Sequence, residues 1–347
     1  MKKKQLILAL LVLLALAALL YWGRDRIHFN FGVFRAQLAL ANWRSIGIGL
    51  ACIYLGYIIR AIRWALLMKH NKKVPLFSLL GTQVIGFTAV ALIGRVADLV
   101  RPYLVAKRTG LELSTQIAVY VVERLFDAGS MVLIFSSVIL LAPAGSLPHP
   151  EIVKKAAYAF LASTVAGALF LVAVRLAGGL VASFFQHTFG LLSKNLGLAA
   201  GHKIRTFRSG LDTMRSFSEF GVIAGLSLSM WLLISLAYLE IARAFVASPP
   251  LASMTLGKCM LLLAASGGAS VFQLPVLGWF TQIAAVAATL VGLGAAPEAA
   301  TACAATLLLV TFLGIAPIGL VWARFEHVSI RKIASESEHA SEELGGE

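Results

Sequence analysis

The chain has 347 residues, of which 59% are hydrophobic and only 13% are charged. A soluble domain of this size carries about 25% charged residues, so the composition excludes an ordinary soluble protein. The formal net charge of +14 would suggest nucleic acid in a soluble protein, but in a chain of apolar segments basic residues set topology and meet anionic lipid. We therefore expect an all-α polytopic protein of a bacterial or archaeal cytoplasmic membrane, with membrane lipids and no nucleic acid as partners.

The first segments alternate apolar and basic stretches. Residues 1–4 are a basic start, and residues 5–22 form a continuous apolar run. We interpret this run as a retained helix; the alternative is a signal peptide cleaved near Ala17. Residues 23–42 are expected to form a polar external loop, followed by a span over residues 43–68.

The next apolar stretch, residues 77–106, is too long for one span and too short for two. It carries Arg95, Asp98 and Arg101 beside Gly94 and Pro102. A charge at the bilayer centre costs about 2.5 kcal/mol or more, and non-helical backbone at that depth is tolerated only inside protein or along a cavity. We predict a re-entrant hairpin from the cytoplasmic side, broken at Gly94 and Pro102, that lines a polar chamber.

Residues 114–141 are expected to cross outward and carry Glu123, Arg124 and Asp127. The two acids are four residues apart and share one helix face, and Arg124 can pair with Asp127 at i,i+3. Two interpretations stay open for the three residues. In the first, they bind a headgroup or compensate Arg95 and Arg101 across the chamber; in the second, they form a buried ion network that holds the hairpin.

The second half has a similar plan. We expect a crossing over 151–175, interfacial cytoplasmic helices over 178–219, a crossing over 220–246, a second hairpin over 251–293 broken at Gly267–Gly268 and Pro275, and a crossing over 299–322. This predicts about eight transmembrane helices, both termini cytoplasmic, a membrane domain over 1–325 and a tail over 326–347 that is disordered from Ser335.

Residues 43–141 and 220–323 share the order of a long span, a Pro-containing turn and an interrupted apolar run. In opposite orientations they would form an inverted repeat, which in transporters places the substrate site at the midplane. The alternative is that any two membrane hairpins look alike at this level.

The remaining polar residues are assigned by their positions. Arg60 and Arg63 lie near the end of a span and are expected to anchor it at the interface. Lys258 is placed deep enough in the second hairpin to touch a substrate. Gln282 is a candidate substrate ligand as well, although a helix–helix hydrogen bond is the plainer role.

Several of these positions together carry a family resemblance. The chain resembles the lysylphosphatidylglycerol synthase transmembrane-region family, whose pattern is Gly-Phe, then Pro-x-Arg-x-Gly-Glu, then Arg and Tyr two or three residues on, and then a Glu-Arg-x-x-Asp helix. The matching residues are Gly86-Phe87, Gly94-Arg95, Asp98, Arg101 and Glu123-Arg124-Leu125-Phe126-Asp127.

The sequence also departs from the family pattern. Ile93 stands for the Pro and Ala97-Asp98 for the Gly-Glu. The family motif in the second half includes a nearby glutamate. In this chain Thr281 and Gln282 lie near that position, and no acid is present there.

The resemblance implies a flippase-like protein that moves phospholipids or polyprenyl-linked lipids between leaflets. No aminoacyl-transferase domain is expected here, and no metal-binding, nucleophile-elbow or Walker motif occurs, so we expect neither enzyme activity, cofactor nor metal. The alternatives are a membrane-embedded transferase, with Glu123 or Asp127 as base, and a scaffold that recruits a lipid-synthesis enzyme.

Overall fold

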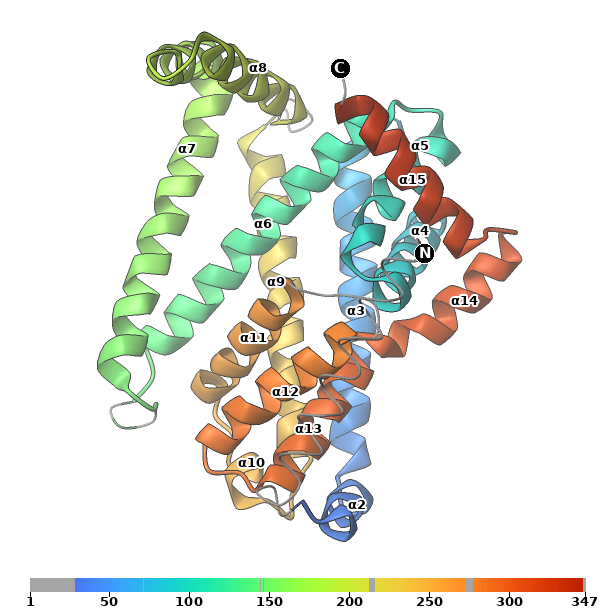
Figure 1. The fold of residues 1–347 in the computed structure, drawn as a ribbon, viewed down its shortest axis with the longest axis vertical. Coiled ribbons are helices and arrows are strands. Elements are labelled where there is room, and N and C mark those ends of the chain that lie inside the picture. The colour runs from blue at the N-terminus through green and yellow to red at the C-terminus, as the bar shows by residue number, and fades with distance from the viewer. Residues whose placement is uncertain are drawn as a thin grey trace.

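The computed structural model describes residues 29–70, 72–143, 145, 147–211, 216–271 and 277–345. Within these ranges the chain is helical and contains no strand, which confirms the all-α class (Figure 1). The expected first span over residues 5–22 and the break at Pro275 lie outside the described residues.

Two long antiparallel helices, α3 (Trp43–Met68) and α9 (Phe217–Arg243), run side by side through the middle of the molecule (Figure 1). Gly49 of α3 packs against Ile241, and Gly56 further along α3 faces Met230, an earlier residue of α9. The missing Cβ atoms allow the two backbones to approach closely, as small residues do between membrane helices.

The predicted first hairpin is present. It consists of α4 (Leu76–Ile93), the 3₁₀ helix η1 (Arg95–Leu99) and α5 (Val100–Thr109). Gly94 ends α4 with φ +92°, a backbone conformation that favours glycine, so the break falls where the sequence indicates. Pro102 is not a break, because it lies in the first turn of α5, where its missing N–H has no helical partner to lose.

The helices α6 (Leu113–Leu140) and α7 (Pro150–Gly190) follow and pack on each other. Non-helical backbone at Ala177 kinks α7, and its last turns lie against α8 (Lys194–Leu211) at one end of the molecule (Figure 1). Helices were expected in this region, and Gly197 and Gly201 of α8 pack closely on Gln186.

The second half repeats the order of a long helix, a hairpin and a returning helix. After α9 come α10 (Pro249–Ala252), α11 (Leu256–Val271), α12 (Leu277–Gly292), α13 (Pro297–Thr311), η2 (Leu313–Ile315) and α14 (Ala316–Phe325). Because α3 and α9 are antiparallel, the two hairpins point toward each other from opposite ends (Figure 1).

The predicted break at Gly267–Gly268 is wrong. The helix α11 continues through both residues to Val271, since glycine costs only about 1 kcal/mol inside a helix and tertiary packing outweighs that cost. The hairpin tips nevertheless meet: the indole Nε1 of Trp279, near the start of α12, donates to the Ala91 carbonyl near the end of α4 at 3.0 Å.

Within the described ranges, four helices are long and apolar enough to cross a membrane, or five if the pair 297–311 and 313–325, bent by 41°, forms one span. This confirms a polytopic membrane protein, with fewer such helices than the eight expected. The legs of the second hairpin are shorter than a full span, and α6, with 28 residues, carries Glu123, Arg124 and Asp127 in its middle.

Two segments expected to lack structure are helical. α2 (Phe31–Ala39) is capped at its N-terminus by Asn30, whose Oδ1 accepts from the Gly32 amide at 2.9 Å. The disordered tail predicted from Ser335 is instead part of α15 (Ile330–Gly345). Its apolar face buries Ile333 and Ala334 against the first hairpin, as helical periodicity permits.

Candidate functional site

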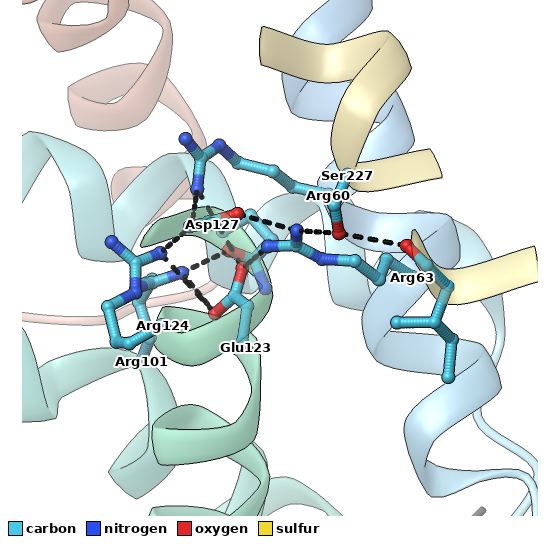
Figure 2. Close-up of polar contacts among 9 residues, drawn as sticks. Arg60, Arg63, Arg101, Glu123, Arg124, Asp127 and Ser227 are labelled. Atoms are coloured by element: carbon cyan, nitrogen blue, oxygen red, sulfur yellow. Dashed lines mark hydrogen bonds and ion pairs between the residues drawn. The ribbon is translucent and has the colours of Figure 1, made fainter. Parts of the chain in front are cut away.

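The candidate site is a cluster of four arginines around two acids, and we call these six residues the arginine cluster (Figure 2). Both acids project from α6, and guanidinium groups reach them from α3, α5 and α6 itself. The cluster consists of Arg60, Arg63, Arg101, Glu123, Arg124 and Asp127.

Arg63 bridges the two acids. Its Nη2 donates to Glu123 Oε1 at 2.6 Å and its Nη1 to Asp127 Oδ1 at 2.5 Å. The same Nη1 reaches Ser227 Oγ of α9 at 2.6 Å. Arg60 Nη1 donates to the other Asp127 oxygen at 3.2 Å. The α3 helix thus clamps both carboxylates and ties them to the second half of the molecule.

Arg101 approaches Glu123 from the first hairpin. Its Nη1 lies 3.1 Å from Glu123 Oε2 and 3.0 Å from Gln83 Oε1. Aromatic rings surround its guanidinium, with the Phe87 ring centroid 4.5 Å from Cζ, an arrangement that favours a cation. A Cβ on Gly86 would overlap the Arg101 side chain, so glycine is required at that position for this arginine to pass.

The arginine cluster is buried and has an excess of positive charge. The side chains of Arg63, Arg101 and Glu123 are each 1% exposed, whereas that of Arg124 is 33% exposed. Four guanidinium groups face two carboxylates, a formal charge of +2. Asp98 is close enough to act on Arg124 electrostatically, and counting it still leaves the group positive.

Four arginine nitrogens in the cluster make no hydrogen bond to any described residue. They are the buried Nε atoms of Arg63, Arg101 and Arg124, and Nη2 of Arg124, which nevertheless lies in an ion pair with Asp127. A buried donor left without a hydrogen bond costs about 1–3 kcal/mol. Arginine recognises phosphate and carboxylate through such donors, so an anionic oxygen is the group that fits this site chemically.

The structure brings together four of the predicted site residues, Arg101, Glu123, Arg124 and Asp127. The expected i,i+3 ion pair between Arg124 and Asp127 is present, with Arg124 Nη2 2.9 Å from Asp127 Oδ2. Asp98 is half-buried in η1 beside the cluster. The Arg95 side chain lies outside the described residues, although its backbone belongs to η1.

The other two predicted ligands lie elsewhere. Lys258 is in the first turn of α11, at the base of the second hairpin and not near its tip. Gln282 of α12 donates to Ser266 Oγ of α11 at 2.6 Å. It therefore makes the helix–helix hydrogen bond that we expected as the alternative to substrate binding.

Arg60 and Arg63 correct the sequence interpretation. They were expected at the membrane interface, but both are buried in the arginine cluster. One signal could have identified them: two acids on one face of α6 need more positive partners than Arg124, and two arginines three residues apart on one face of a neighbouring span match that need. Gln83 and Ser227 carried no comparable signal.

No group of three or more His, Cys, Asp or Glu residues that could hold a metal ion occurs in the part of the chain that the structure describes. The three cysteines, Cys52, Cys259 and Cys303, are unpaired thiols in helices.

Comparison with known proteins gives one match. The family model described as the lysylphosphatidylglycerol synthase TM region matches residues 6–319. No curated protein and no solved structure matches the chain. The matched range contains the arginine cluster and both hairpins.

Proposed function

The chain belongs to the lysylphosphatidylglycerol synthase transmembrane-region family, and from that membership we propose that it moves an anionic phospholipid or a polyprenyl-linked lipid between the leaflets of the membrane. The family places the protein in lipid modification or translocation. In this proposal the arginine cluster binds the phosphate of the lipid headgroup, and the protein makes and breaks no covalent bond.

The arginine cluster is the observation that carries the proposal. Burying three arginines and two acids inside a membrane protein, with a fourth arginine partly exposed beside them, is costly unless every charge is compensated. The surplus of positive charge and the three Nε donors without acceptors would be satisfied by phosphate oxygens. The exposed part of Arg124 marks the side from which a headgroup would enter.

The architecture supports translocation as the use of that binding. Two interrupted hairpins that enter from opposite ends are the arrangement expected of transporters with a midplane site. Among the described residues, the tips touch through the hydrogen bond from Trp279 to Ala91. Such a contact, worth about 1 kcal/mol, is weak enough to break and reform as the site opens to one side and then the other.

The test is exchange of a fluorescent anionic phospholipid between the leaflets of proteoliposomes, followed by a membrane-impermeant quencher. We expect the protein to accelerate exchange over protein-free vesicles. Arg101→Gln, which removes one charged partner of the phosphate, should slow exchange about tenfold or more. Arg44→Gln is the matched control, because Arg44 is exposed and outside the cluster.

Equal rates in the protein, in Arg101→Gln and in empty vesicles would overturn the proposal. Recovery of a covalently altered lipid would favour the transferase alternative, and a protein that moves no lipid but retains a bound synthesis enzyme would favour the scaffold.

A further inference from the structure

A second buried polar group lies in the other half of the molecule. Tyr238 of α9, Ser266 of α11 and Gln282 of α12 meet around the Ser266 hydroxyl, and we call them the neutral triad. The Tyr238 hydroxyl is 2.8 Å from Ser266 Oγ, and Gln282 Nε2 donates to the same oxygen at 2.6 Å. All three residues are less than 10% exposed.

The neutral triad occupies the place in its half that the arginine cluster occupies in the other. The arginine cluster and its immediate partners draw Arg63 from the long helix α3, Gln83 from the first hairpin leg and Arg101 from the second. The neutral triad likewise draws one side chain from the long helix α9 and one from each leg of the second hairpin. The two groups therefore lie in corresponding parts of the two halves, one strongly charged and one uncharged.

The Trp279–Ala91 hydrogen bond connects the two groups through the hairpin tips. Trp279 is one helical turn from Gln282, and Ala91 is one turn from Phe87, which contacts Arg101. Along this series of contacts the hairpin tips lie between the arginine cluster and the neutral triad.

Gln282 is the residue that indicates a ligand. Its Oε1 is buried and accepts no hydrogen bond from any described residue, which is costly for an amide oxygen. Turning the amide around would leave an NH₂ donor unsatisfied in its place. A hydroxyl group satisfies either orientation because it both donates and accepts. A phosphate oxygen fits only one of them.

We propose that the neutral triad is a subsite for an alcohol group of the translocated headgroup, and that it selects anionic lipids whose headgroup carries hydroxyls beyond the phosphate. This inference rests on the proposed function and names the substrate class. The alcohol can belong to a glycerol headgroup or to a sugar on a polyprenyl phosphate, and the test separates these sources.

The experiment measures leaflet exchange for two matched lipid pairs. Phosphatidylglycerol is compared with phosphatidylethanol, which has the same single negative charge and no hydroxyl, and a polyprenyl-phosphate hexose is compared with the ethyl ester of the same polyprenyl phosphate, a phosphodiester of equal charge that has no hydroxyl. The wild type should move the hydroxylated member of one pair about threefold to tenfold faster, the value of one or two neutral hydrogen bonds. The pair that shows the preference identifies the source of the alcohol.

Tyr238→Phe and Gln282→Leu should each remove that preference, so that the hydroxylated lipid moves no faster than its hydroxyl-free partner. Thr301→Val is the control, because the Thr301 hydroxyl is exposed and bonds only within its own helix. No preference in either pair, or a preference that survives both variants, would overturn the inference while leaving the proposed function intact. A failure to move any of the four lipids would overturn both.

Discussion

Replacing Glu123 by glutamine tests the arginine cluster most severely, because it keeps the shape of the side chain and removes its charge. Glu123 accepts from Arg63 at 2.6 Å and from Arg101 at 3.1 Å. The glutamine amide would turn an NH₂ group toward one of these donors. The cluster would then hold four guanidinium groups against Asp127 alone.

The magnitude follows from these contacts. A hydrogen bond between charged groups contributes about 1.5–3 kcal/mol, and removing one partner of a buried ion pair costs about 3–5 kcal/mol. We expect Glu123→Gln to lower the free energy of unfolding by about 3–5 kcal/mol, which lowers the midpoint of thermal unfolding by about 4–7 °C in a chain of this size.

The assay is thermal unfolding in detergent, combined with a double-mutant cycle. Glu123→Gln and Arg63→Gln should be non-additive by more than about 1 kcal/mol, because the two groups share a hydrogen bond. Glu112→Gln is the matched control at an exposed position. A loss below about 1 kcal/mol for Glu123→Gln, or strict additivity with Arg63→Gln, would refute this account of the burial.

Two further predictions concern the first hairpin. Gly86→Ala should slow lipid exchange about tenfold, because the added Cβ would displace Arg101. Gly268→Ala is the control and should leave exchange unchanged, because the space at its Cβ is open. Equal effects of the two variants would contradict the close packing of Gly86 against Arg101. The Lys107 ammonium holds the pKa of the Glu336 carboxyl below its ordinary value near 4.5. A lowered pKa in the folded state stabilises α15 packing above pH 4.5, and this contribution is lost as the pH falls through the lowered pKa. The protection factors of the α15 amides, which correct hydrogen exchange for the pH dependence of its intrinsic rate, should therefore be higher at pH 7 than below pH 4.5, and Glu336→Gln should remove the difference; a variant that keeps it would contradict the assignment.

The sequence predicted features that depend on local chemistry. Gly94 marks the break of the first hairpin because its positive φ favours glycine. Glu123 and Asp127 share a face because helical spacing dictates it. The first-hairpin break and one side of the arginine cluster were therefore accessible from the sequence alone.

The features it did not predict depend on distant partners. Arg60 and Arg63 resemble interface anchors until the acids of α6, 60 or more residues later, are placed beside them. α15 was overlooked because its acidic, Ser-rich composition outweighed the apolar stripe formed by Ile330, Ile333 and Ala334. These residues become informative only when a neighbouring hairpin is available to cover them.

The most direct test of the central claim is the affinity of the purified protein for short-chain phosphatidylethanol, which presents one anionic phosphate, compared with short-chain phosphatidylcholine. We predict that the anionic lipid binds about tenfold more tightly, that Arg101→Gln removes the difference, and that Arg44→Gln retains it. Equal affinity for the two lipids in the wild type, or a preference that survives Arg101→Gln, would contradict phosphate binding by the arginine cluster.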